Sequence, residues 1–219
     1  MARVRVWGVR ILLLISFLCG TGEAQSISVG VTGGGRVTDD VAYSAVPESR
    51  RYVVGPMVEL GLPFGLAVEV DALYHRQGYQ VSNGNFAGFV VQSERGNSWE
   101  FPVLLKYKLP VAKINPFAEV GLAPRVISGN IAESGASINV TTGVSTPFSD
   151  TVKTNFDASY GFVAGGGVQF DIGRLRLSPE VRYTHWMSTP IYGYFGDGPS
   201  YSSTQNQADV LVGIGWKLN

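Results

Sequence analysis

The sequence predicts an all-β fold, an eight-stranded antiparallel up-and-down barrel, and three observations support this prediction. Apolar residues recur at every second position along most of the chain, which is the period of a β-strand and not of a helix. The connections between these periodic segments are alternately short and long. The 219 residues include 28 glycines and 11% aromatic residues but only 16% charged residues, against about 25% charged residues in a typical soluble domain.

The composition also limits the class of protein. The formal net charge is zero, so the chain lacks the basic excess that nucleic-acid binding requires, and we expect no nucleic-acid partner. The high content of apolar and aromatic residues excludes a disordered chain. The length suits a single folded domain, and no internal repeat or linker indicates a second one.

The first 24 residues are predicted to be a cleaved secretory signal peptide. Arg3, Arg5 and Arg10 precede an apolar run over residues 11–18, and small residues end at Ala24, which is the order of parts in a signal peptide. The alternative is a buried helix of the mature domain. The only cysteine, Cys19, lies in this segment. Residues 25–219 are therefore expected to form the barrel without disulfides, and they contain no apolar stretch of about 18 residues that would form a transmembrane helix.

Eight segments alternate between an apolar face and a face that mixes glycine with both signs of charge. In chain order the apolar faces consist of Ile27, Val29 and Val31 in residues 27–32; Tyr52, Val54, Val58 and Leu60 in 51–62; Leu66, Val68, Val70, Ala72 and Tyr74 in 66–77; Trp99, Phe101, Val103, Leu105 and Tyr107 in 99–109; Ala118, Val120, Leu122 and Val126 in 118–126; Tyr160, Phe162, Ala164, Val168 and Phe170 in 157–172; Leu175, Leu177, Val181 and Tyr183 in 174–183; and Val210, Val212, Ile214, Trp216 and Leu218 in 209–218. The first segment is the weakest. Eight strands can close a small barrel.

The lengths of the connections indicate which kind of barrel this is. The short connections lie near residues 63–65, 110–115 and 173, and the long polar ones near 39–50, 81–97, 129–155 and 187–206. Outer-membrane barrels have short periplasmic turns on one side and long extracellular loops on the other. Because an even number of strands returns the chain to its starting side, both termini are expected to face the periplasm.

The two faces also suit a membrane barrel, in which the apolar face points to lipid and the polar face points inward. Aromatic residues lie near both ends of the apolar face, as expected for two girdles at the lipid–water interfaces. The girdle toward the long loops is predicted to contain Tyr52, Tyr74, Trp99, Tyr160 and Tyr183, and the girdle toward the short turns Tyr107, Phe170 and Trp216. Outer-membrane lipid is therefore an expected partner.

The inward face is predicted to hold a charge network that fills the lumen, because buried charges are costly unless they are paired. The alternative is a charged ion path through a narrow pore, although eight strands leave little free width. The predicted network contains Glu59, Glu69, Asp71, Glu100, Lys106, Lys108, Glu119, Arg125, Asp171, Arg176, Glu180, Arg182 and Asp209. Asp157, Arg36, Arg51, Arg174 and Lys217 are expected on the same face, which gives equal numbers of acids and bases.

Several stretches resemble the small outer-membrane β-barrels of Gram-negative bacteria, the PorT-like group akin to the OmpA and OmpX barrels. Residues 99–107 (WEFPVLLKY), 115–121 (NPFAEVG), 165–168 (GGGV) and 177–183 (LSPEVRY) are similar to strands of that group. The end of the chain departs from the terminal phenylalanine common in such barrels, and Trp216 or Leu218 is expected to meet the barrel assembly machinery instead. The resemblance implies an outer-membrane location and no reaction.

The strongest candidate for an enzyme site is His185 with Ser188, because lipid A deacylases of the PagL type use a strand histidine and serine. Their pattern is His-x-Ser, whereas a spacing of three residues puts the two side chains on opposite faces of a strand. His185 is then an interfacial residue beside Tyr183, and His75 belongs to the lumen. Two separate histidines without cysteine make a weak metal site, so we predict no catalytic residue, metal or cofactor.

The sequence therefore predicts a monomeric outer-membrane protein with a structural or surface-interaction role, in which the external loops meet an unidentified partner. The sequence also allows three alternatives. They are a narrow pore, a lipid-acting esterase that uses His185 and Ser188, and a soluble lipocalin-like carrier with its apolar face inward.

Overall fold

A computed structural model describes residues 26–43, 46–85, 87–109, 114–155, 158–188, 192–193 and 201–218. The predicted signal peptide, residues 1–24, lies outside the described residues. Within the described part of the chain, no helix has the length and apolar character needed to cross a membrane.

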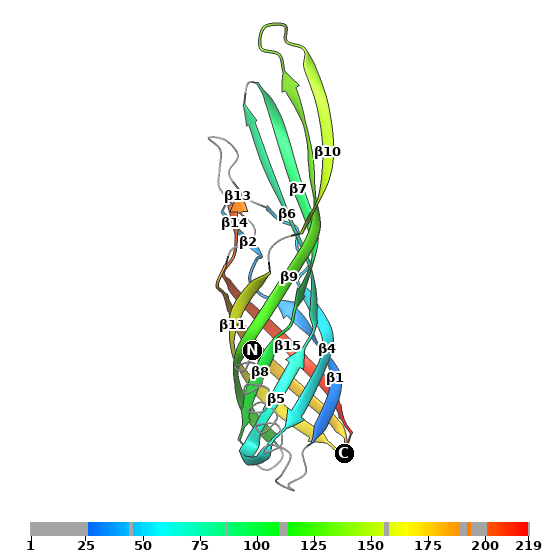
Figure 1. Cartoon of the computed structure of the whole chain (residues 1–219), viewed down its shortest axis with the longest axis vertical. Helices are drawn as coiled ribbons and strands as arrows, with labels where there is room; N and C mark the ends of the chain where they lie inside the picture. The colour runs from blue at the N-terminus through cyan, green and yellow to red at the C-terminus, as the bar shows by residue number, and fades with distance from the viewer. Residues whose placement is uncertain are drawn as a thin grey trace, which may run out of the picture.

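Antiparallel strands close into a ring (Figure 1). The strands are β1 (Ile27–Arg36), β4 (Tyr52–Gly61), β5 (Leu66–Asp71), β6 (Leu73–Asn85), β7 (Gly88–Glu100), β8 (Val103–Lys108), β9 (Ile114–Ile138), β11 (Ser159–Ile172), β12 (Leu175–Trp186) and β15 (Asn206–Lys217). Around the ring, β1 pairs with β4, and β4 pairs with both β5 and β6. β5 then pairs with β8 and β6 with β7, both β7 and β8 pair with β9, and β11, β12 and β15 follow in turn. The ring closes because β15 pairs with β1, from Ser28 opposite Lys217 to Arg36 opposite Asp209.

Two of the barrel strands are interrupted without losing their register. Val70 lies opposite Val103 and Leu73 opposite Glu100, so the pairing of β5 with β8 continues directly into the pairing of β6 with β7. One interruption falls at Pro102, which has no backbone N–H to donate to a neighbouring strand. Counted as continuous strands, β5 with β6 and β7 with β8 complete the eight strands that the sequence predicts, and the predicted barrel is confirmed.

The short turns lie where the sequence places them. The turn between β4 and β5 is a single 3-10 turn, η1 (Pro63–Gly65), and β11 joins β12 through a turn at Gly173. Gly65 and Gly173 have φ angles of 75° and 63°, a region that glycine adopts without the steric cost of a Cβ atom. Residues 110–113 of the third predicted turn lie outside the described residues.

The long connections differ from the prediction, because two of them form strands and not irregular loops. β6 and β7 continue as a hairpin to Asn85 opposite Gly88, and β9 continues to Ile138, where β10 (Ser145–Asn155) returns beside it. Residues 77–85, 88–96 and 129–138 together with β10 form a four-stranded sheet that stands beyond the barrel (Figure 1). We call it the projecting sheet. The β-ladder satisfies backbone groups that a bare loop would leave to water.

The other two long connections contribute short strands at the same end of the molecule. β2 (Val41–Tyr43) pairs with β14 (Tyr201–Ser203), which pairs with β13 (Tyr192–Gly193). β3 (Val46–Pro47) pairs with β6. Residues 44–45, 189–191 and 194–200 of these connections lie outside the described residues.

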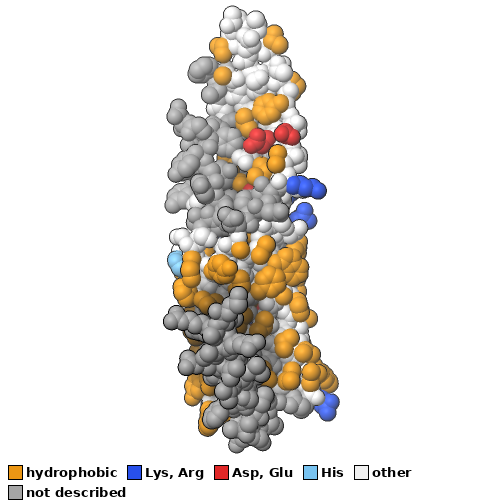
Figure 2. Space-filling model, viewed as in Figure 1, with side chains coloured by type: hydrophobic (Ala, Val, Ile, Leu, Met, Phe, Trp, Pro, Cys, Tyr) orange, Lys and Arg blue, Asp and Glu red, His pale blue; other side chains and the backbone are white. Residues whose placement is uncertain are grey.

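The predicted orientation of the two faces is confirmed. Along β4, Val58 is 48% exposed whereas its neighbour Glu59 is 1% exposed. On the face that Figure 2 shows, apolar side chains gather over the lower part of the molecule, and we call this region the apolar belt. This arrangement is the reverse of a soluble barrel, so the alternative of a lipocalin-like carrier is wrong.

Candidate functional site

The centre of the lumen contains a cluster of six buried charged side chains from four strands. Lys106 Nζ lies 2.8 Å from Glu69 Oε2 and 3.2 Å from both Glu119 Oε2 and Glu180 Oε2. Arg182 reaches four carboxylates, at 2.5 Å to Glu180, 2.8 Å to Asp71, 3.1 Å to Glu119 and 3.3 Å to Glu69. We call this group the central cluster. It crosses the lumen from β5 to β9 and β12.

A second group, the turn-side cluster, lies toward the short turns. Glu59 accepts hydrogen bonds from Lys108 Nζ, at 2.5 Å, and from Arg176. Asp171 lies 2.9 Å from Lys217 Nζ and 3.6 Å from Arg176 Nε. The Asp171 and Lys217 side chains are 27% and 22% exposed, so this end of the lumen is more open than its centre.

A third group, the loop-side cluster, lies toward the projecting sheet. Arg36 contacts Glu100 at 2.9 Å, Asp209 at 3.0 Å and Asp40 at 3.1 Å. Asp40 Oδ2 also lies 2.7 Å from His75 Nε2. Gln207 Nε2 donates to Asp209 and Glu100 at 2.7 and 3.2 Å, so it completes the hydrogen bonding of these acids.

Arg125 faces the lumen, on the predicted face of its strand, but it contacts an aromatic ring and not a carboxylate. Its guanidinium lies 3.8 Å from the ring centroid of Trp186, a cation–π contact. Arg125 Nε donates to Ser159 Oγ at 3.0 Å, and its Nη2 has no hydrogen-bond partner in the described part of the chain. Trp186 Nε1 in turn donates to Gln207 Oε1 at 2.9 Å, which connects this pair to the loop-side cluster.

The structure thus brings twelve of the thirteen predicted network residues into three ion-pair clusters, with Arg36 and Lys217 among their partners. Two of the other expected inward charges are exposed. Arg51 pairs with Asp39 at 2.8 Å outside the lumen, and Arg174 lies at the exposed turn after β11. These two expectations are wrong because both residues lie at the rims of the barrel, where side chains reach water. Asp157 lies outside the described residues.

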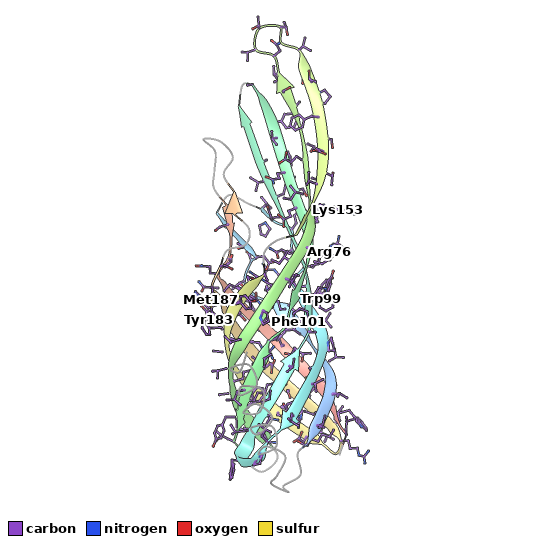
Figure 3. All side chains as sticks on the ribbon, viewed as in Figure 1. Arg76, Trp99, Phe101, Lys153, Tyr183 and Met187 are labelled. Atoms are coloured by element: carbon purple, nitrogen blue, oxygen red, sulfur yellow. The ribbon has the colours of Figure 1, made fainter. Side chains whose placement is uncertain are left out.

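The predicted aromatic residues lie on the outer face. Toward the loops, Tyr74 lies between Tyr52 and Trp99, with ring centroids 6.3 and 5.3 Å apart, and Trp99 stacks on Phe101 at 6.4 Å. Figure 3 places Trp99 and Phe101 at about the level of Tyr183 and Met187. Tyr160 is 57% exposed there, and Tyr107 and Trp216 are 50% and 51% exposed toward the short turns, with Phe170 half-buried.

His185 lies on the outer face beside Tyr183. Its Nδ1 lies 2.9 Å from Asn206 Oδ1, the same atom to which the Tyr183 hydroxyl donates at 2.7 Å. Ser188 is exposed and follows the end of β12. The histidine is therefore engaged with the neighbouring strand β15 and not with the serine.

One group of carboxylates has the spacing of a metal site. Oxygens of Glu69, Glu119 and Glu180 lie within 4.8 Å of one another. Lys106 Nζ lies 2.8 to 3.2 Å from all three side chains, so an ammonium group already supplies the positive charge that a metal ion would bring.

A closed ring of eight strands, apolar outside and charged inside, defines an integral outer-membrane β-barrel. The chain belongs to the outer membrane protein β-barrel domain family, whose model matches residues 23–185. Its location is the outer membrane of a Gram-negative bacterium. The family resemblance predicted from the sequence motifs is confirmed, and the narrower PorT-like assignment stays a prediction.

Several solved outer-membrane barrels have a similar fold. They include the N-terminal β-barrel domain of Pseudomonas aeruginosa OprF (11% identity, covering 88% of this chain and 97% of that one, TM-score 0.42), Neisserial surface protein A (12% identity, 89% and 99%, TM-score 0.43) and Ail, the attachment invasion locus protein of Yersinia pestis (12% identity, 89% and 97%, TM-score 0.37). No curated protein sequence matches the chain at a significant level.

Proposed function

We propose that this protein is a non-enzymatic surface-interaction protein, in which the barrel is a rigid base and the projecting sheet is the binding element. The observation that carries this proposal is the continuity of β9, which runs without a break for 25 residues from the barrel into the projecting sheet. A binding surface built on continuous strands is held in one conformation, and little entropy is then lost when a partner binds.

The chemistry of the projecting sheet favours a protein partner. In the part of the chain that the structure describes, β10 pairs with β9 alone, so its other edge offers backbone donors and acceptors to a partner, although Thr151 N–H already donates to Asp150 Oδ1 at 2.7 Å. An extended peptide can add to such an edge as a further strand. Apolar side chains lie along the hairpin, with Phe148 41%, Val152 56% and Val144 59% exposed, and they supply contacts for the side chains of the added strand.

We further propose that the lumen is closed and does not conduct ions. The support for this is that three ion-pair clusters follow one another along the lumen. In the central cluster Lys106, Glu69 and Arg182 are all at most 3% exposed. A barrel of eight strands has little width beyond what its own side chains fill.

The experiment that tests the surface-interaction role shortens the β9–β10 hairpin. Residues 131–152 are replaced by a two-residue Asn-Gly turn that joins Asn130 to Lys153, which lie opposite each other in the ladder. We expect the barrel to fold as before, and cells that display the shortened protein to lose the partner binding that cells with the full protein show.

The matched control shortens the β6–β7 hairpin at residues 82–91, which leaves the edge of β10 in place. Binding that survives removal of the β9–β10 hairpin would contradict the proposal. If binding is lost only when the β6–β7 hairpin is shortened, the partner contacts the β6 side of the projecting sheet and not the edge of β10.

A further inference from the structure

A groove lies on the outer face of the molecule at the foot of the projecting sheet. It has a volume of about 410 Å³ and is lined by Glu48, Arg50, Arg76, Gln77, Gly78 and Arg95. Three of these six residues are arginines and one is an acid, so the groove is basic. None of the three arginines takes part in the lumen clusters.

The groove is built by a segment that docks on the edge of β6. The backbone N–H groups of Glu48 and Arg50 donate to the carbonyls of Gly78 and Arg76, at 2.8 and 2.9 Å. The Ser49 hydroxyl donates to Gly78 O at 3.1 Å and accepts from Gly78 N at 3.0 Å. A Cβ atom at Gly78 would lie 3.3 Å from Glu94 O and 3.4 Å from Glu48 Cβ, so the segment packs within van der Waals distance of this position. These bonds hold Arg50 beside Arg76.

The positive charge continues across the neighbouring strands on the same face. Arg95 lies opposite Gly78, and Asn130 lies opposite both Arg95 and Lys153. Directly opposite residues of a sheet share a face, so Lys153 extends the basic surface. The acid Glu48 contacts Arg95 at 3.4 Å, and both side chains are partly exposed, at 33% and 67%. One exposed, long ion pair leaves most of this positive charge free to meet an anion.

The height of the groove relative to the membrane indicates which anion it meets. Arg76 follows Tyr74 by two residues on the outer face, so it lies about 7 Å farther along the strand, which is about 5 Å above the girdle at the strand tilt of such barrels. Figure 3 shows Arg76 and Lys153 above Trp99 and Phe101, and Figure 2 shows basic side chains directly above the apolar belt. Girdle aromatics lie at the level of the lipid headgroups. The arginines therefore lie in the polar layer of the outer leaflet or just outside it.

We propose that this basic groove binds the phosphate groups of lipids in the outer leaflet. Arginine binds phosphate with two parallel N–H donors, and Arg50, Arg76 and Arg95 present three such groups around one groove. Arg51 offers a contrast, because it is also exposed but is satisfied by Asp39 Oδ1 and the carbonyl of Val37, both at 2.8 Å. The groove would thus fix phosphorylated lipid on one side of the barrel.

The test measures which lipid contacts Trp99, because that indole lies on the outer face just below the groove. The protein purified from outer membranes is reconstituted in dibrominated phosphatidylcholine, which quenches exposed tryptophans, and unbrominated phosphatidic acid is added in steps. All proteins carry Trp216→Phe, so the reporting indole is Trp99, while Trp186 is 0% exposed. We expect phosphatidic acid to restore the fluorescence at a several-fold lower mole fraction than unbrominated phosphatidylcholine does.

The triple variant Arg50→Gln, Arg76→Gln and Arg95→Gln is expected to lose this preference, so that phosphatidic acid and unbrominated phosphatidylcholine restore the fluorescence at about the same mole fraction. Arg51→Gln is the matched control and should keep it. If the triple variant does not fold, Arg76→Gln alone is expected to show a partial loss. An unchanged preference in the folded arginine variants would overturn the proposal, as would an equal loss in Arg51→Gln.

Inorganic phosphate at constant ionic strength separates a lipid headgroup from a free anion. A preference that persists in inorganic phosphate supports the lipid as ligand. A preference that inorganic phosphate abolishes would overturn the assignment to lipid, because the groove would then take the free ion.

Discussion

Lys106 and Arg182 face four carboxylates in the middle of the barrel, so each cation is shared among several acids. Arg182 alone contacts Asp71 at 2.8 Å and Glu119 at 3.1 Å. A buried ion pair gives little net stability, but removal of one partner leaves an uncompensated buried charge, which is strongly destabilising. Single residues in this cluster therefore have large effects, although the network as a whole contributes modestly.

Replacement of Arg182 by methionine is predicted to destabilise the barrel by about 3–5 kcal/mol, because the acids around it lose their shared cation. The midpoint of urea unfolding in lipid bilayers measures this change. Arg51→Gln is the control, because its partner Asp39 is 48% exposed, and it should cost less than about 1 kcal/mol. Equal midpoints for the two variants would contradict the role assigned to Arg182.

The sequence predicts the face on which a charged residue lies, because that depends only on whether its position is odd or even along the strand. It does not predict the partner. Glu59 and Arg176 contact each other although 117 positions separate them, and only the register of the closed barrel brings them together. Asp40 was missed altogether, because it lies in a connection where period two gives no information.

At the scale of elements, β1 depends on glycine for its close approach to β15. An ideal Cβ atom at Gly34 would lie 2.0 Å from the carbonyl oxygen of Val210, whereas one at Gly35 would have an ordinary 3.8 Å contact with the carbonyl of Arg51. The two glycines are adjacent, but a Cβ atom at the first would run into the backbone of β15 and one at the second would not. This difference gives a matched pair for a test.

Gly34→Ala is predicted to weaken the closure of β1 on β15, with a cost of about 1–3 kcal/mol or more, whereas Gly35→Ala should fold like the parent. The measurement is the fraction of protein that keeps the compact, unheated mobility on a gel after refolding into detergent. The prediction fails if both alanine variants refold equally well.

The projecting sheet contains a buried acid that makes its stability depend on pH. Burial raises the pKa of Glu94 from 4.5 to about 7, although a hydrogen bond from Tyr79 opposes this. One Glu94 oxygen has no hydrogen-bond partner among the described residues. The folded sheet holds the proton more tightly than the unfolded chain, so the stability that Glu94 contributes is present below about pH 4.5 and is lost as the pH rises through about 7.

We compare hydrogen exchange of residues 77–96 in the parent and in Glu94→Gln at each pH. As the pH rises from about 5 to about 8, exchange in the parent is predicted to become increasingly faster than in the variant. The difference in local opening free energy should reach about 3 kcal/mol. Comparison at each pH removes the intrinsic pH dependence of exchange. Glu133→Gln, which changes an exposed acid of the same sheet, should follow the parent. If the exchange rates of the parent and of Glu94→Gln change in parallel with pH, Glu94 is not the source of the pH dependence.

The projecting sheet has no strand signal in the sequence. Residues 81–97 and 129–155 are rich in small and polar residues and lack the apolar alternation of the barrel strands, so the sequence predicts loops there. Outside the membrane neither face of a sheet needs to be apolar. The pairing there continues the register that the barrel strands already set, as in Trp99 opposite Val126 and Gly88 opposite Ser137.

For the whole molecule, the prediction from the three lumen clusters is that the folded protein conducts little or no current. Planar lipid bilayers measure this, with the compact, heat-sensitive gel mobility as proof of folding. Steady openings of large conductance from folded protein would contradict the closed lumen. Lys106→Ala in the central cluster is expected to raise the frequency of brief openings, because it removes the cation that three glutamates share.

The architecture of the whole molecule was the most predictable level. Period two, the alternation of short and long connections and the aromatic ends of the apolar face are properties of the chain itself, and all three are typical of outer-membrane barrels. The depth of the ion-pair clusters and the height of the projecting sheet depend on contacts between distant strands, which no local pattern records.

The hydrogen-bonded seam between β1 and β15 has a consequence for the order of assembly. The first strand finds its partner 173 positions later in the chain, at Arg36 and Asp209, so the contact order of this closure is among the highest the chain allows. Such non-local pairing is slow, because the entropy of closing the loop is lost before the contacts form. Until the final strand arrives, the edge of β1 is open to any other strand, and the chain must be kept from aggregating during that interval.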